Sequence, residues 1–220
     1  MGLCDLTFPI RSFWCFELMD PPQFLAPLLT IIAVVSAGII IILDDRKLGI
    51  GMLALQYICV SILTGLFISD RVLPLKLIAG TSVILIMFRS AGQLGWKQNG
   101  GAEEALPSGR LFRIIAVLLL STGSLGIGRS LFVGLPNIQP VAISSFLLLS
   151  ALGLLQLSLR ESPFEIALGL FTLINGFEII YSSMESSLAV LALLALTHIG
   201  IAISISIITI DVEPGLQGRQ

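Results

Sequence analysis

The stretch "LGLFTLINGFEIIYSS", residues 168–183, decides the class of protein. It lies in an apolar run over 163–183, and about 20 consecutive apolar residues are enough to cross a bilayer as a helix. Thr172, Asn175 and Glu178 interrupt this run with polar groups. The stretch therefore predicts a membrane-spanning helix that carries a carboxylate inside the bilayer.

The composition of the whole chain agrees with a membrane protein. Of its 220 residues, 55% are hydrophobic and only 12% are charged, whereas a soluble domain carries roughly 25% charged residues. The mean hydropathy is +1.01. Because unpaired backbone groups are prohibitive in hydrocarbon, the spans must be helical. We therefore expect an all-α, polytopic transmembrane helix bundle in the lipid bilayer. The net charge of −2, without a basic patch, does not indicate nucleic-acid binding.

The apolar runs predict about seven spans and one sizeable loop. Residues 1–23 are predicted to be an external segment and 211–220 a cytoplasmic tail. The Gly-, Pro- and charge-containing stretch over 89–110 is predicted to be a cytoplasmic loop between helices 1–3 (24–88) and helices 4–7 (111–210). The individual spans are expected at 24–43, 48–68, 72–88, 111–133, 141–159, 163–183 and 187–210.

The distribution of basic residues predicts the orientation. With these spans, one side of the membrane holds Arg46, Lys47, Arg89, Lys97, Arg110, Arg113, Arg160 and Arg219, and the other holds Arg11, Arg71, Lys76 and Arg129. The positive-inside rule then places the N-terminus outside and the C-terminus in the cytoplasm. The first twenty residues are net acidic, which is not typical of a cleaved signal peptide. We expect an integral protein of a prokaryotic cytoplasmic membrane.

Two sets of three spans share a weak likeness. Each set has a tight charged turn, "DDRK" at 44–47 or "RESP" at 160–163, followed by a helix with polar residues at mid-membrane depth. Gln56 in the second span roughly mirrors Ile174 and Asn175 in the sixth. One interpretation is a weak repeat of a three-helix unit.

The polar residues of the sixth span form a stripe. At 100° per residue, Thr172, Asn175, Glu178 and Ser182 fall within an arc of about 120°, and Glu165 lies beside it. An ionisable residue at the centre of a span costs at least ~2.5 kcal/mol, which indicates a function. We interpret Glu178 as a proton-handling group, and interhelical hydrogen bonding is the alternative. For Thr172 and Asn175 we favour interhelical hydrogen bonding, and a place in a proton path with Glu178 is the alternative. Glu165 is either an entry point of a proton path or a snorkelling side chain.

Three further residues are interpreted from their depth in the membrane. His198 lies near the centre of the seventh span, and histidine gains and loses a proton near neutral pH. It is either a relay member linked to Glu178 through water or a neutral histidine that donates to a backbone carbonyl or a serine. Lys76 and Arg129 lie near outer helix ends and are expected to snorkel to the interface.

No motif for a metal or a cofactor is found. The chain has three cysteines without a C-x-x-C spacing, and its single histidine excludes a bis-histidine haem within the chain. Cys4 and Cys15 are either a disulfide in an oxidising compartment or two free thiols. There is no nucleophile elbow, P-loop or dinucleotide fingerprint. We expect no catalysis by this chain alone, although it can belong to an oxidoreductase complex.

Residues 145–208 resemble a group of small membrane subunits. These are the K subunit of bacterial complex I, the C subunit of multisubunit sodium/proton antiporters and hydrogenase-4 component E. The resemblance lies in "GFEI" at 176–179, "GLFTLING" at 169–176 and "IGIA" at 199–202. Length and span number are more similar to the hydrogenase component. The chain departs from the group at Ile174 and Leu196, where these subunits carry glutamates, so only Glu178 carries over.

The resemblance implies a subunit without a redox cofactor, embedded between larger antiporter-like or other polytopic subunits that translocate protons or sodium. Small residues that can contact partner helices are Gly123, Gly126, Gly128, Gly169 and Gly176. One alternative is a purely structural or assembly subunit. The other is a small independent secondary transporter built on the repeat, although its spans lack the Gly/Pro-broken helices usual at such sites.

Overall fold

The chain folds into seven α-helices in a computed structural model that describes residues 21–43, 45–67, 72–94, 109–134, 138–184 and 188–217. The helices are α1 (Pro21–Ile42), α2 (Arg46–Phe67), α3 (Val72–Leu94), α4 (Arg110–Gly134), α5 (Pro140–Leu159), α6 (Pro163–Met184) and α7 (Leu188–Gln217). Prolines at the first positions of α5 and α6 are compatible with a helix start, where a backbone N–H has no intrahelical partner.

Six of these helices are long and apolar enough to cross a membrane: α1, α2, α4, α5, α6 and α7. The prediction of an all-α polytopic bundle is confirmed, and the chain is an integral membrane protein. The shorter third span, now α3, is not one of these six. Helical structure also runs further than expected at two ends, to Leu94 in α3 and to Gln217 in α7. Apolar patterning marks where a span leaves hydrocarbon, whereas backbone hydrogen bonding can continue beyond it.

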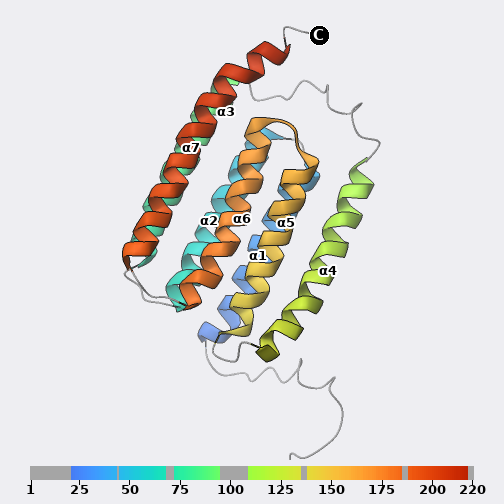
Figure 1. Ribbon diagram of the computed structural model, residues 1–220, viewed down its shortest axis with the longest axis vertical. Helices are drawn as coiled ribbons and strands as arrows, with labels where there is room; N and C mark the ends of the chain where they lie inside the picture. Colours follow the sequence, from blue (N-terminus) through green and yellow to red (C-terminus); the bar gives the residue numbers. More distant parts are fainter. Residues whose placement is uncertain are drawn as a thin grey trace, which may run out of the picture.

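The helices form two layers. In Figure 1, α1, α2 and α3 make one layer, and α5, α6 and α7 lie in front of them. Neighbours within each layer are in contact, and across the layers α1 packs on α5, α2 on α6 and α3 on α7. Helix α4 packs at the edge against α5 and α1. Thus each helix of the first set lies beside the helix at the same place in the second set.

Polar contacts between the layers follow a nearly constant sequence interval. Thr30 contacts Ser145 at an interval of 115 residues. Gln56 contacts Thr172 at an interval of 116 residues, and Ser90 contacts Ser206 at the same interval. The three contacts join α1 to α5, α2 to α6 and α3 to α7, respectively. The two three-helix sets are therefore arranged in register, which agrees with the interpretation of a repeated unit.

Glycines allow α5 and α6 to approach closely. A Cβ atom at Gly153 would lie 2.7 Å from the backbone nitrogen of Leu173, and one at Gly176 would lie 3.0 Å from the backbone nitrogen of Ser150. Gly169 likewise faces Gln156 and Leu157. Gly169 and Gly176 therefore serve contacts within the chain, not contacts with partner helices as the sequence suggested. By contrast, a Cβ at Gly123 or Gly126 on α4 would meet nothing within 4 Å among the described residues.

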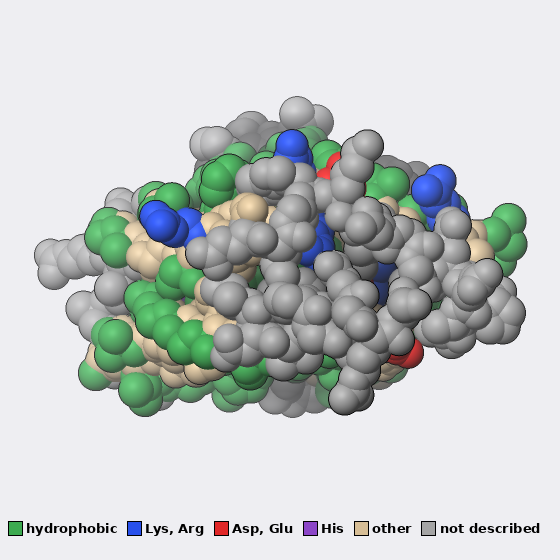
Figure 2. Space-filling model, turned by 90° about the horizontal axis from the view of Figure 1, so that it is seen from above, with side chains coloured by type: hydrophobic (Ala, Val, Ile, Leu, Met, Phe, Trp, Pro, Cys, Tyr) green, Lys and Arg blue, Asp and Glu red, His purple; other side chains and the backbone are tan. Residues whose placement is uncertain are grey.

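The apolar core has two clusters, one on either side of α2. One is built mainly from α1, α5 and residues of α2, and the other from α2, α3 and α6. Figure 2 shows the end of the bundle where α7 terminates, with Lys and Arg side chains (blue) around parts of it. This is the face predicted to be cytoplasmic, and its orientation stays a prediction.

Candidate intramembrane charge site

A buried ion pair joins α3 to α6. The Nζ of Lys76 lies 3.4 Å from Oε1 of Glu178, and the two side chains are only 7% and 5% exposed. Lys76 also donates to Oγ1 of Thr64 on α2, and the Thr64 hydroxyl in turn donates to the carbonyl of Val60. The opposite charge within 4 Å and the added hydrogen bond offset part of the cost of removing both ions from water.

The expectation that Lys76 snorkels to the interface is wrong. Lys76 lies near the Val72 end of α3, and Glu178 lies near the Met184 end of α6. Because the two helices run in opposite directions, these ends meet on the same side of the bundle (Figure 1). A lysine one turn inside α3 and a glutamate nearly two turns inside α6 therefore reach similar depths. The depths of Lys76 and Glu178 can be estimated from the sequence, but the ion pair follows from them only if α3 is known to lie close to α6.

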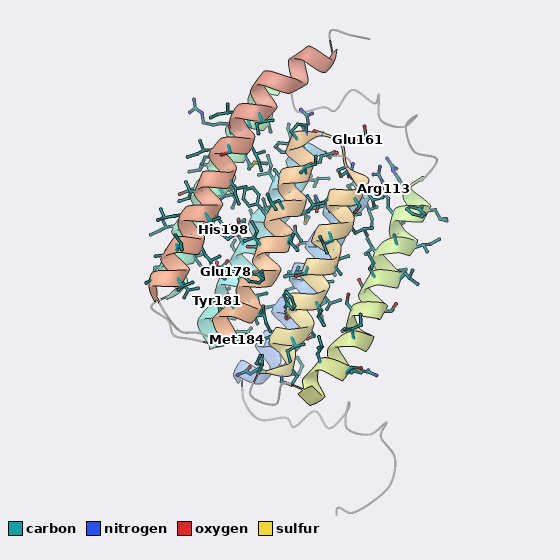
Figure 3. The ribbon with its side chains drawn as sticks, in the orientation of Figure 1. Arg113, Glu161, Glu178, Tyr181, Met184 and His198 are labelled. Carbon is teal, nitrogen blue, oxygen red and sulfur yellow. The ribbon has the colours of Figure 1, made fainter. Side chains whose placement is uncertain are left out.

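A small cavity adjoins the ion pair. It measures about 10 Å³ and is lined by side chains of α2, α3, α6 and α7, namely Tyr57, Val60, Ser61, Lys76, Ala79, Asn175, Glu178, Ala195 and His198. A cavity of about this size holds roughly one water molecule. Figure 3 shows Glu178 on α6 and His198 on α7 at neighbouring levels of the bundle. Two predicted site residues on different helices, Glu178 and His198, thus line the same small cavity.

His198 is held by its backbone and by two aromatic rings. Its Nδ1 lies 2.9 Å from the carbonyl oxygen of Leu194, one turn earlier in α7. Its ring stacks on Phe171 at 6.2 Å between centroids and meets Tyr57 edge-on at 5.8 Å. Such offset and edge-to-face arrangements are favourable for aromatic rings. The ring therefore has a fixed orientation, with its other nitrogen free of these contacts.

The remaining stripe residues have different surroundings. The Thr172 hydroxyl lies 3.2 Å from Oε1 of Gln56 on α2 and 2.9 Å from the carbonyl of Leu168. This is an interhelical contact of the kind expected for Thr172. Asn175 is fully buried beside the cavity, and neither its Oδ1 nor its Nδ2 has a partner within the described part of the chain.

A second charged cluster lies at the other end of α6. Nη1 of Arg160 lies 3.2 Å from Oε1 of Glu165, and Nη2 donates to the carbonyl of Ile41 at 2.9 Å. Gln156 donates to the backbone carbonyl of Glu165 at 3.4 Å. The Arg46 guanidinium lies 5.7 Å from the centre of the Phe164 ring, a cation–π distance. These groups surround another cavity of about 10 Å³.

The structure thus divides the five predicted site residues into two places. Glu178, His198 and Asn175 line one cavity, with Thr172 one turn along α6 from Asn175. Glu165 belongs to the Arg160 cluster, 13 residues or about 20 Å along the helix from Glu178. The sequence did not indicate Lys76 and Tyr57 as neighbours of Glu178, or Thr64 as a partner of Lys76. Tyr57 and Thr64 carry no signal by themselves, because a single Tyr or Thr in an apolar span is common.

No group of three or more metal-binding side chains occurs among the residues that the structure describes. Cys59 is a buried free thiol, while the alternatives for Cys4 and Cys15 concern residues outside the described ranges. Comparisons with family models, curated proteins and solved structures found no match to this chain. The chemistry of the site must therefore be argued from its own residues.

Proposed function

We propose that the chain is a cofactor-free membrane subunit of a proton- or sodium-translocating assembly of the complex I-like, hydrogenase or antiporter type. In this proposal Glu178 contributes an intramembrane carboxylate to the ion path, and larger polytopic subunits surround the chain. The resemblance over residues 145–208 supports the class of assembly. The geometry around Glu178 supports the role of the carboxylate.

The observation that carries the proposal is the buried pair of Lys76 and Glu178 beside a water-sized cavity. Both members can exist in neutral form, because an ammonium can lose a proton and a carboxylate can gain one. A buried pair of this kind is poor evidence for added stability, since removing both charges from water costs about as much as the pair returns. A site that must bind and release a proton gives a reason to retain it.

One structural observation favours a second candidate, the small independent secondary transporter. The two three-helix sets pack helix on counterpart helix, with contacts at intervals of 115 and 116 residues. Repeats that run in the same direction across the membrane occur in some transporter families, with polar sites at the repeat interface. The Lys76–Glu178 pair and its cavity lie at such an interface. Purification in mild detergent separates the candidates, because a subunit brings large polytopic partners with it and an independent transporter does not.

Glu178→Gln tests the function directly. Glutamine keeps nearly the same shape and can still form hydrogen bonds, but its amide does not gain or lose a proton near neutral pH. We expect the variant to assemble normally, because Lys76 can lose its proton once the carboxylate is gone, and to lower proton movement by the complex in reconstituted membranes. Positioned acid–base groups typically contribute 10²- to 10⁴-fold to a rate, so a loss of about tenfold or more is expected.

Glu161→Gln is the matched control. Glu161 is an exposed carboxyl in the turn before α6, at the opposite end of that helix from Glu178 (Figure 3). This variant is expected to keep full proton movement and normal subunit content. Full activity of Glu178→Gln in a complete assembly would make the carboxylate a packing group, and the structural or assembly function would replace the proposal.

A further inference from the structure

The hydrogen bond of His198 fixes which ring nitrogen carries the proton. A backbone carbonyl can only accept, so Nδ1 at 2.9 Å from the Leu194 carbonyl must be the donor. In the neutral ring the second nitrogen, Nε2, is then a bare acceptor. His198 is only 2% exposed, and its Nε2 has no partner among the described residues. A buried acceptor of this kind costs free energy unless something donates to it.

Two neighbouring side chains also have buried polar atoms without a hydrogen-bond partner among the described residues. The hydroxyl of Tyr57 and both polar atoms of Asn175 are buried without a partner in the described part of the chain. Tyr57, Asn175 and His198 lie on three different helices and all line the cavity beside the ion pair. Lys76 is already engaged by Glu178 and Thr64. Three helices therefore each place a cavity-lining residue with unused hydrogen-bonding capacity here, four polar atoms in all.

We propose that this cavity is a binding site for a single water molecule, which donates to Nε2 of His198 and bonds to Asn175. Buried waters typically make about three hydrogen bonds to otherwise unsatisfied polar groups. The cavity of about 10 Å³ is large enough for one such molecule and too small for an organic ligand. The four unpartnered atoms supply the two to four polar contacts that a buried water needs.

The bound water has a consequence for the site. It lies in the cavity that Lys76 and Glu178 also line, so His198, Asn175 and the ion pair border one water-sized space. The water site itself does not depend on proton translocation, because unsatisfied polar atoms call for a partner in any function.

The single histidine of the chain makes the proposal measurable. The full-length chain, labelled with ¹⁵N-histidine and reconstituted in lipid bilayers, gives one imidazole in solid-state NMR. We expect a neutral ring protonated at Nδ1, with Nε2 showing the shift of a hydrogen-bond acceptor. Magnetisation transferred from water protons is expected to reach Nε2. A proton found on Nε2, or the absence of transfer from water, would overturn the site.

Two variants show whether the water lies in this cavity. Asn175→Leu places an apolar side chain against the cavity and is expected to reduce the water transfer to Nε2 several-fold. Tyr57→Phe keeps the ring that packs on His198 and removes only one polar atom, so it is expected to give a smaller reduction. Ser36→Ala is the control. The buried hydroxyl of Ser36 donates to the carbonyl of Ala33 in its own helix, so its removal should leave the transfer unchanged. Unchanged transfer in both Asn175→Leu and Tyr57→Phe would place the water elsewhere and refute the proposal, whatever the fate of proton translocation.

Discussion

Helix α6 carries a buried ion pair at each end, and the two pairs differ in the cation. Near its C-terminus Glu178 pairs with Lys76 at 3.4 Å, and near its N-terminus Glu165 pairs with Arg160 at 3.2 Å. Lysine can lose its proton inside a protein, whereas the guanidinium of arginine stays charged. The Lys76–Glu178 pair can therefore become neutral by moving one proton, and the Arg160–Glu165 pair cannot.

The surroundings of the two pairs support this division. Arg160 donates to the carbonyl of Ile41 in the last turn of α1, where backbone carbonyls lack intrahelical partners. It thereby ties the turn before α6 to the other layer. Lys76 bonds only a threonine hydroxyl besides its carboxylate among the contacts that the structure gives, and a cavity of about 10 Å³ lies beside it. The comparison teaches that Arg160 links α1 to α6 through two contacts, whereas the Lys76–Glu178 pair, which can become neutral, fits the proposed proton exchange.

The largest effect is expected from breaking the arginine pair. Arg160→Gln leaves Glu165 as a buried carboxylate without its partner, and removing one member of a buried pair typically costs about 3–5 kcal/mol. We expect a large loss of folded protein, measured as the thermal unfolding temperature in detergent and the yield from membranes. Arg110→Gln, at the exposed start of α4, is the control and should behave like the parent chain. Equal stability of the two variants would mean that Arg160 does not hold the layers.

Exchanging the cations tests the difference itself. Lys76→Arg keeps the positive charge but holds its proton permanently, so we expect a folded chain whose complex moves protons about tenfold more slowly or worse. Arg160→Lys keeps a charge beside Glu165 and should leave proton movement near the parent level, with a modest loss of stability from the lost guanidinium contacts. Both are measured as proton uptake in reconstituted membranes. If Lys76→Arg were fully active, the lysine would serve only as a counter-charge.

The smallest effect is expected from a neutral neighbour of the lysine pair. Asn175→Ala removes a buried amide beside the cavity, and because neither of its polar atoms has a partner among the described residues, the loss of stability should be smaller than that of Arg160→Gln. We expect mainly weaker assembly, seen as a lower ratio of this chain to its partners after purification, with proton movement per assembled complex retained. Loss of proton movement without loss of assembly would instead make Asn175 part of the ion path.

Much of the fold could be predicted from the sequence, and less of the site. Long apolar runs predicted the class of fold and the places of the helices, because crossing hydrocarbon requires a continuous helix of about 20 residues. The ends of α3 and α7 were missed, since both helices continue beyond their apolar runs. The stripe on α6 indicated that Glu178 and Asn175 face protein. The partner of Glu178 was not found, because a lysine near the end of a span has the same local pattern whether it snorkels to water or turns inward. Gly169 and Gly176 were wrongly predicted to contact partner helices, because a small residue has the same pattern whether it serves a contact within the chain or between chains.

The sequence by itself determined that this is an all-helical membrane protein with a carboxylate buried in its sixth helix. Only the tertiary structure decided which groups meet that carboxylate. Lys76 and Glu178 are 102 residues apart in the chain, and His198 comes from a further helix. Hydropathy fixes the depth of each residue in the membrane, but depth is only one of the three coordinates that define its position. The other two depend on which helix faces pack together, and here close glycine contacts between α5 and α6 and the pairing of the two layers set them.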